Sequence, residues 1–291
     1  MLKEADVTQH VVVTGAAGYI GRHVVTALLD EGARVTAVVR QQRAYRVDER
    51  AEIVELDLLA HDADLASLTH EVPDAVVHLA WEAGFAHNAP AHMLRLSDHY
   101  RVLEHFARAG VRRIAALGTM HEIGRHEGAI TAETPTNPMS LYGIAKDALR
   151  RATLHSFGDE HVVQWLRAYY IYGDDRNNQS IFTKLLQAAD QGKTTFPFTT
   201  GTNRFDFIHV RELGQQIAAV VLQDELQGVI NVCSGEPVSL REQVERFIAE
   251  HELDIELEIG AFPDRPYDSK ETYGDATAIQ ELMARREAAQ G

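Results

Sequence analysis

The chain has 291 residues, 45% of them hydrophobic and 24% charged, which is typical of a globular protein with a sizeable core. Its formal net charge of −15 opposes binding to nucleic acid and to anionic lipid surfaces, so we expect neither as a partner. The single cysteine, Cys233, excludes an internal disulfide, and no stretch has the pattern of a membrane span or a secretory signal, so we expect a soluble protein of the reducing cytoplasm.

Strands and helices are expected to alternate over the first part of the chain. Apolar segments rich in Val and Ile predict strands at 10–14, 34–39, 52–56, 74–80, 112–118 and 162–168. Apolar residues at helical spacing predict helices at 20–31, 91–109 and 141–157, with C-terminal caps at Gly32 and Gly110. Because this β-α-β order requires right-handed crossovers, it predicts an α/β fold with a Rossmann-type, doubly wound parallel sheet.

The alternation loosens beyond residue 168. Helices are expected near 180–191 and at 210–223, a strand at 228–232, and an acidic, proline-containing tail after them. We therefore expect a Rossmann domain at 1–168 and a smaller lobe at 169–291, with part of 206–235 packing back on the Rossmann domain.

A glycine-rich loop follows the first expected strand and leads into the first helix. It reads Gly15-Ala16-Ala17-Gly18-Tyr19-Ile20-Gly21. Gly15 permits the sharp turn, Gly18 lets the backbone approach a pyrophosphate, and Gly21 lets the helix pack closely on the strand. The N–H groups of the first helical turn would face that anion. We therefore favour a nicotinamide dinucleotide site, rather than a glycine turn without a ligand, made by Gly15, Ala17, Gly18, Tyr19, Ile20 and Gly21.

The residue after the second strand bears on the choice of cofactor. Dinucleotide folds usually carry an acidic residue there that binds the adenosine ribose, whereas this chain has Arg40. A guanidinium can pair with a 2′-phosphate, and Arg43 is close enough in sequence to assist, so we expect NADP first and NAD second. The alternative is that Arg40 is a solvated loop charge. After the third strand, Asp57 can accept a hydrogen bond from the adenine amino group, with Leu58 beside it.

Tyr142 and Lys146 lie four residues apart in the helix expected at 141–157, so they share one helical face. An ammonium beside a phenol would lower the pKa of Tyr142 from its usual value of about 10, which suits proton exchange with a substrate oxygen. Lys146 can also hold the nicotinamide ribose. Thr119 follows the strand at 112–118, at the sheet edge where ligands of such folds bind, and can donate to the same oxygen. We therefore expect these three residues to be catalytic.

These motifs, in this order and at these separations, resemble the extended short-chain dehydrogenase/reductases, the nucleotide-sugar epimerase/dehydratase family. Further matches are His78-Leu79-Ala80, Arg167 to Gly173, and Asp206-Phe207-Ile208-His209-Val210. The resemblance implies that Leu79 and Ala80 contact the cofactor, that Trp81 contacts the substrate, and that the smaller C-terminal lobe binds that substrate. In the family, the helices that correspond to 91–109 and 141–157 pair into a four-helix bundle between subunits, so a homodimer is expected.

Departures from the family pattern bear on the reaction and the substrate. The Asp-Glu pair that serves water elimination in the family's 4,6-dehydratases is replaced by Met120-His121, which disfavours dehydration and leaves these two side chains to line the substrate pocket. Tyr170 stands where the family has an asparagine that contacts the diphosphate. Arg265 resembles the family's late arginine that reaches the sugar-nucleotide pyrophosphate, and Arg204 is the alternative candidate.

The residues and the resemblance together predict an NAD(P)-dependent oxidoreductase that acts on a nucleotide-diphospho-sugar at a 4-keto or 4-hydroxyl centre. A nucleotide-sugar 4-epimerase would use the same three catalytic residues and is the first alternative. A catalytically silent NADP-binding regulator and a reductase of non-nucleotide carbonyls are further alternatives. No metal site is expected, because His121 and His126 are five residues apart and do not share a helical face.

Overall fold

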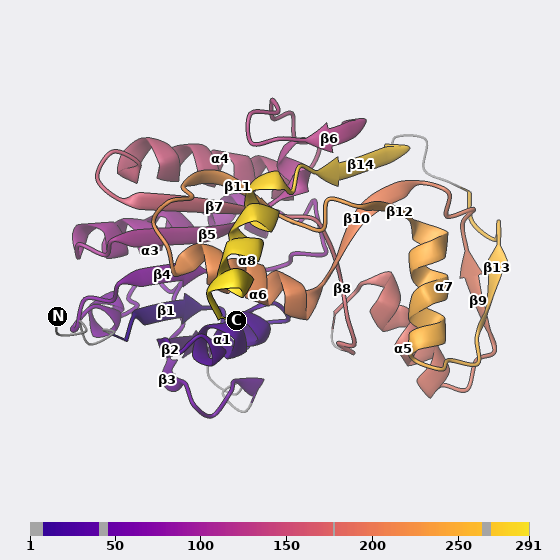
Figure 1. The fold of residues 1–291 in the computed structure, drawn as a ribbon, viewed down its shortest axis with the longest axis horizontal. Helices are drawn as coiled ribbons and strands as arrows, with labels where there is room; N and C mark the ends of the chain where they lie inside the picture. The colour runs from indigo at the N-terminus through magenta and orange to yellow at the C-terminus, as the bar shows by residue number, and fades with distance from the viewer. Residues whose placement is uncertain (1–7, 41–45, 177, 264–268, 291) are drawn as a thin grey trace.

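A parallel sheet forms the centre of the molecule (Figure 1). The computed structural model describes residues 8–40, 46–176, 178–263 and 269–290. Within them a seven-stranded sheet has the order β11-β7-β5-β4-β1-β2-β3, with every neighbouring pair parallel. Its strands are β1 (His10–Thr14), β2 (Arg34–Val39), β3 (Glu52–Glu55), β4 (Ala75–His78), β5 (Arg113–Thr119), β7 (Val162–Ala168) and β11 (Gly228–Val232). The doubly wound α/β fold predicted from the sequence is therefore confirmed.

Helices cover both faces of this sheet. One face carries α1 (Gly21–Asp30), α6 (Val210–Val221) and α8 (Thr277–Gln290), and the other carries α3 (Leu96–Arg108) and α4 (Leu141–Phe157). Strand side chains alternate between the two cores. In β1, Val11 and Val13 belong to the core under α1 and α6, whereas Val12 belongs to the core under α3 and α4. Among the described residues, no helix is long and apolar enough to cross a membrane.

The helix expected at 91–109 is two helices. α2 (Ala91–Leu94) and α3 meet at Arg95, whose ψ of 0° is far from the value of about −42° that continues an α-helix. The strand expected at 74–80 ends at His78. Leu79 and Ala80 instead leave the strand and cross the end of β1. The N–H of Leu79 donates to the Thr14 carbonyl oxygen at 3.2 Å, and the N–H of Ala80 donates to the Thr14 hydroxyl at 3.4 Å.

The smaller lobe lies to one side of the large sheet (Figure 1). It contains the short strands β8 (Tyr170–Tyr172), β9 (Thr195–Phe198), β10 (Arg204–His209), β12 (Pro237–Ser239) and β13 (Glu256–Ile259), with the helices α5 (Ile181–Asp190) and α7 (Leu240–Glu250). β10 also pairs with β14 (Glu271–Gly274), which pairs with β6 (Gly128–Ile130). Phenylalanines dominate the core of this lobe, among them Phe182, Phe198, Phe205, Phe207 and Phe247. The segment after β11, which was expected to be an acidic tail, contains the regular elements β12, α7, β13, β14 and α8.

Two elements from the second part of the chain belong to the large sheet and its cover. β11 pairs with β7 at the edge of that sheet, and α6 packs in the same core as α1. We keep 1–168 and 169–291 as proposed domain bounds, and propose that α6 and β11 from the second range pack on the Rossmann domain.

Candidate active site

The carboxyl ends of β1 and β4 meet where the strand order reverses. Thr14 and His78, the last residues of these strands, are paired in the sheet. After Thr14 the chain turns at Gly15 (φ +68°), where a Cβ atom would lie 2.7 Å from the backbone nitrogen of Ala80. At Gly21 a Cβ atom would lie 2.2 Å from the carbonyl oxygen of Gly15. Both positions require glycine, and the loop lies in the crevice where doubly wound sheets bind ligands.

The start of α1 suits an anion. No side chain caps the helix at Ile20, so no capping oxygen neutralises its positive end. The N–H of Gly18 donates to the carbonyl of Gly15 at 2.9 Å and closes the loop. Ala17 is buried, and burial raises the pKa of the half-buried Tyr19, which stays neutral. The loop thus combines the close backbone approach and the electrostatics that a dinucleotide pyrophosphate needs.

Arg40, directly after β2, is an ion-paired side chain. Its Nη1 lies 3.1 Å from Oε1 of Glu82, which follows β4, and the other Glu82 oxygen lies 3.9 Å from Nε of Arg95. The side chains of Arg40 and Glu82 are 55% and 37% exposed, so solvent screens the pair. The guanidinium expected to receive a 2′-phosphate therefore faces a carboxylate, which would repel that phosphate.

The other residues expected near the adenosine lie in different settings. Asp57 is exposed after β3 and is accessible to a ligand. Leu58 is 4% exposed and packs in the core under α3, so its side chain is not available to a cofactor and only its backbone can face one. Arg43 lies outside the described residues.

Thr119, Tyr142 and Lys146 come together at the carboxyl end of β5. Thr119 is the last residue of that strand, and its side chain lies near the phenol of Tyr142, where it favours the phenolate. The other two come from α4, where the hydroxyl of Ser140 caps the helix by accepting the N–H of Gly143 at 3.2 Å. Tyr142 and Lys146 then lie one turn apart on the same face. The cluster offers a hydroxyl, a phenol and an ammonium at one place.

Burial sets the charges of this cluster. It raises the pKa of Tyr142 to about 12 and lowers the pKa of Lys146 to about 7. The Nζ of Lys146 donates to the carbonyl oxygen of Leu117 at 2.6 Å and lies 3.8 Å from the centre of the Trp81 ring. We expected Lys146 to lower the pKa of Tyr142, and that direction was wrong, because loss of solvent around the phenol outweighs the groups near it.

Glu122 is a functional candidate that the sequence argument missed. It ends the short 3₁₀ helix η3 (Met120–Glu122) and is fully buried. Its Oε1 accepts the N–H of Thr119 at 2.8 Å and the indole N–H of Trp165 at 2.9 Å. Its Oε2 faces two arginines, Arg150 at 3.5 Å and Arg167 at 3.6 Å. Thr-x-x-Glu is the pattern of a capping box, so the sequence did contain a signal for this residue.

Histidines surround the site in a way that the sequence argument also missed. The ring of His87 stacks on that of Tyr142 at 5.4 Å, and the His87 carbonyl accepts the N–H of Tyr142 at 2.8 Å. His92 and His99 are buried, and both rings stack with Trp81. These two histidines are seven residues apart, close to two helical turns, which is the pattern that could have indicated a shared face.

Two residues expected to bind the substrate lie beside the cluster. The ring centres of Trp81 and His121 are 6.1 and 6.0 Å from that of Tyr142. Burial lowers the pKa of His121 to about 4, so its imidazole is neutral. Met120 is 7% exposed and packs in the core below α1 and α6, so its side chain does not line an open pocket.

The remaining substrate candidates lie in or near the smaller lobe. The ring of Tyr170 on β8 packs against Phe205 at 4.5 Å, within the aromatic core. Arg204 begins β10, and its Nε lies 2.8 Å from a carboxylate oxygen of Glu271. Arg265 lies outside the described residues. The ring contacts of Tyr170 are to Phe205 and Phe207, and Arg204 bonds to Glu271 and to the Pro237 carbonyl, all within or beside the smaller lobe.

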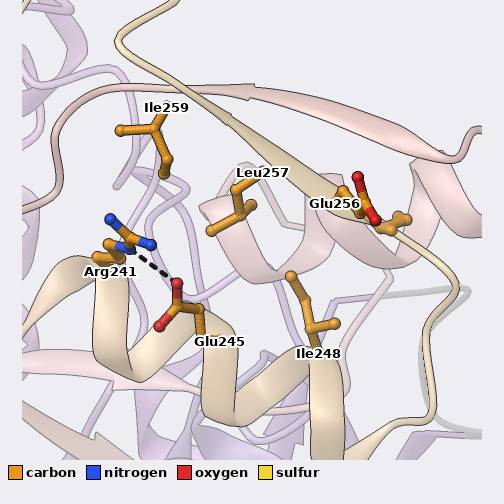
Figure 2. Close-up of a pocket in the computed structure, with 7 residues that line it drawn as sticks. Arg241, Glu245, Ile248, Glu256, Leu257 and Ile259 are labelled. Carbon is orange, nitrogen blue, oxygen red and sulfur yellow. Dashed lines mark hydrogen bonds and ion pairs between the residues drawn. The ribbon is translucent and has the colours of Figure 1, made fainter.

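A separate surface pocket lies between α7 and β13 (Figure 2). Figure 2 shows Ile248 pointing from α7 toward β13, with Arg241 bonded to Glu245 along the helix. None of the residues expected to be catalytic or to bind the cofactor lines it. The full lining is Arg241, Glu245, Ile248, Ile255, Glu256, Leu257 and Ile259.

Known proteins are similar to this chain in sequence and in fold. Residues 11–233 match the model of the NAD dependent epimerase/dehydratase family. The chain is 41% identical over 268 residues to dTDP-6-deoxy-L-talose 4-dehydrogenase (NAD(+)) of Aggregatibacter actinomycetemcomitans, covering 91% of this chain and 99% of that relative. It is 27% identical to UDP-glucose 4-epimerase of Azospirillum brasilense, covering 97% and 88%. The solved structure of MoeE5 with UDP-glucuronic acid and NAD matches with a TM-score of 0.75 at 26% identity, covering 94% and 92%.

Proposed function

This chain belongs to the NAD dependent epimerase/dehydratase family, and we propose that it is a nucleotide-sugar 4-dehydrogenase that interconverts a 4-keto and a 4-hydroxyl group with NAD(H). It is an enzyme of the extended short-chain dehydrogenase/reductase type. One observation carries the proposal. Thr119 ends β5, Tyr142 lies near it, and Lys146 donates to the Leu117 carbonyl of the same strand at 2.6 Å, next to the strand pair that holds the glycine loop.

The three residues divide the acid–base work at one sugar oxygen. Bound nicotinamide supplies or accepts a hydride at the sugar carbon. Tyr142 is a neutral phenol, with a pKa of about 12, and holds the proton that the sugar oxygen takes up during reduction. Thr119 orients the phenol and donates a hydrogen bond to the same oxygen. Lys146 donates to the Leu117 carbonyl, and from there its ammonium form can bind ribose hydroxyls.

The proposed substrate class is a dTDP-linked 6-deoxy sugar. The support is the relative named dTDP-6-deoxy-L-talose 4-dehydrogenase, which matches nearly the full length of both chains at 41% identity. A 4-epimerase is the second candidate, because the chain is also similar to UDP-glucose 4-epimerase. The two reactions differ in the fate of the cofactor, which a dehydrogenase consumes and an epimerase regenerates.

The proposed cofactor is NAD(H). The sequence favoured NADP because of Arg40, but that guanidinium pairs with Glu82, which would repel a 2′-phosphate and can accept a hydrogen bond from a ribose hydroxyl. The relative with 41% identity is named for NAD(+), which supports the same choice.

The proposed assembly is a homodimer through α3 and α4. A groove between these helices is lined mostly by apolar residues, and Met93 in its lining is 41% exposed. A second copy could bury two such faces against each other. Light scattering at micromolar concentration should give twice the mass of one chain, and the mass of a single chain would contradict this. The reducing cytoplasm, expected from the lone Cys233, remains the proposed compartment.

An assay with defined substrates tests the proposed function. Purified protein is mixed with NADH or NADPH and with dTDP- and UDP-linked 4-keto sugars. We expect NADH consumption with a dTDP-4-keto-6-deoxy sugar and one 4-hydroxyl product per NADH. Interconversion of 4-hydroxyl epimers without net NADH change would instead support the epimerase. Binding of the cofactor without turnover of any carbonyl would support the silent regulator, and turnover of carbonyls without a nucleotide would support the remaining alternative.

A further inference from the structure

The indole of Trp81 packs against both the catalytic lysine and a buried histidine. The Nζ of Lys146 lies over the ring, 3.8 Å from its centre. The ring of His99, from α3, stacks with the indole at 4.2 Å and an interplanar angle of 13°. Trp81 therefore joins the end of β4 to α3 and α4 at the place where the proposed reaction occurs.

The indole is also fixed within its own plane. Its Nε1 donates to Nδ1 of His92 at 3.0 Å, and Nε2 of His92 lies 3.0 Å from the carbonyl oxygen of Ala86. The imidazole of His92 can satisfy both contacts only as the tautomer that carries its proton on Nε2. Because His92 is 2% exposed, water does not compete for these bonds.

A chain of hydrogen bonds anchors the histidine that stacks on Trp81. Nδ1 of His99 lies 2.9 Å from Nε2 of His78, and Nδ1 of His78 lies 2.8 Å from the hydroxyl of Thr14. Burial lowers the pKa of His78 to about 3 and also lowers that of His99, so both rings are neutral. The ring that stacks on Trp81 is thus connected through His78 to Thr14, the last residue of β1, directly before the glycine loop.

We propose that Trp81 is a positioning residue that holds the Lys146 ammonium between its indole face and the Leu117 carbonyl. The inference rests on the proposed function, since it assigns Lys146 a role in the same site. It also changes the expectation for Trp81, which the resemblance placed in contact with the substrate. In the structure its ring lies against Lys146 as well as against His92 and His99.

The environment of Lys146 makes the indole important for its charge. Burial lowers the pKa of Lys146 to about 7, so small changes alter its charge at neutral pH. Glu122 on η3 favours the ammonium, while the facing imidazoles of His78 and His99 are neutral, as is the phenol of Tyr142 on the same helix. The negative face of an aromatic ring stabilises a desolvated cation strongly. Without the indole, the ammonium loses one of its few stabilising neighbours.

Lysine NMR measures this contact without any substrate. The chain has five lysines, Lys3, Lys146, Lys184, Lys193 and Lys270, so the Cε signals of a ¹³C-lysine sample can be resolved and the signal of Lys146 assigned by its loss in Lys146→Met. We expect its Hε protons to be shifted upfield by the indole. In Trp81→Leu that shift should vanish and the pKa should fall by about one unit. Trp81→Phe should keep part of the upfield shift and should lower the Lys146 pKa less than Trp81→Leu does. An unchanged shift and pKa in Trp81→Leu would overturn the proposal.

The pH profile of turnover gives a second measurement. Activity that needs the Lys146 ammonium is lost as the pH rises through its pKa, so the alkaline limb of kcat should move about one pH unit lower in Trp81→Leu and return most of the way in Trp81→Phe. If Trp81 contacts only the sugar, KM should rise equally at all pH values and the alkaline limb should stay in place. That result would also overturn the proposal.

A second variant covers the case in which Trp81→Leu does not fold. His99→Leu removes the ring that supports the indole and leaves both Trp81 and Lys146 in place, so it should reduce the upfield shift of the Lys146 signal. An undiminished shift would count against the proposed support. Because the NMR measurement needs no sugar, a protein with the expected lysine signals but no turnover of keto sugars would refute the proposed function and leave this inference standing.

Discussion

The two ends of the proposed cofactor crevice differ in how their polar and charged groups are held. At the proposed catalytic end, Thr119, Lys146 and Glu122 are at most 6% exposed, and each bonds to a residue from a neighbouring element. At the adenosine end, Arg40 and Glu82 form an ion pair with side chains that are 55% and 37% exposed. Electrostatic interactions are strong where water is excluded and weak where solvent screens them. We therefore expect the buried end to control rate and stability, and the exposed end to adjust only the choice between related cofactors.

Removal of the phenol oxygen should have the largest effect. In Tyr142→Phe we expect kcat to fall by about 10²- to 10⁴-fold, because the general acid is lost while the ring remains. NADH binding, followed by fluorescence, should be unchanged. The matched control is Tyr100→Phe, which removes an exposed hydroxyl bonded to Ser156 and should leave kcat intact. A fall in kcat of less than tenfold would remove Tyr142 from the proposed role.

Neutralising the buried carboxylate should have the next largest effect, on stability. Glu122→Gln leaves the buried Arg167 without a negative partner, while Arg150 keeps its pair with Asp147, and we expect the free energy of unfolding in urea to fall by about 3 to 5 kcal/mol. Glu104→Gln is the control, since it breaks only a surface pair with Arg108 and should change stability by less than about 0.5 kcal/mol. Equal stabilities of the two variants would show that the buried end is not held by charge.

Loss of the Thr119 hydroxyl should have a moderate effect on rate. In Thr119→Val we expect kcat to fall by about tenfold, because a single hydrogen bond contributes about 1 to 1.5 kcal/mol. The control is Thr153→Val, which removes a buried hydroxyl of α4 that donates to the Leu149 carbonyl at 2.7 Å. If both variants keep full activity, the contact between Thr119 and the Tyr142 phenol does not serve catalysis.

Changes at the adenosine end should have the smallest effect. Glu82→Gln removes the repulsion of a 2′-phosphate and frees Arg40, so the ratio of kcat/KM for NADPH to that for NADH should rise by about three- to fivefold, as expected for an exposed pair worth less than about 1 kcal/mol. Glu71→Gln is the control, because Glu71 pairs with Arg34 at the other end of β2. A change of a hundredfold or more would mean that this end is not weak, and the contrast between the two ends would fail.

Local patterns in the sequence were enough to predict the fold and the position of the cofactor loop. A glycine loop between a strand and a helix is a local feature, and the alternation of strands and helices determines where the loop sits in the sheet. The proximity of Thr119, Tyr142 and Lys146 could be predicted because a strand end and one helical turn fix their relation. The break of the helix at Arg95 could not, because it depends on one backbone angle rather than on apolar spacing.

What could not be predicted depends on contacts between residues far apart in the chain. Arg40 suggested NADP because the sequence does not reveal its ion-pair partner. That partner, Glu82, lies 42 residues away in the chain and reaches Arg40 from the end of another strand. The direction of the Tyr142 pKa followed from burial, which the spacing of Tyr142 and Lys146 does not reveal. The burial of Glu122 against two arginines is likewise a property of the packed sheet.

Transfer of deuterium tests the central claim most directly. The protein is incubated with NADH carrying deuterium at both C-4 positions and with a dTDP-4-keto-6-deoxy sugar, and the product is analysed by mass spectrometry and NMR. The proposed function predicts one deuterium at C-4 of the sugar with the wild-type protein and a loss of transfer in Tyr142→Phe, which still binds NADH. Transfer at an undiminished rate in Tyr142→Phe, or no deuterium at C-4 of any nucleotide sugar with the wild type, would contradict it.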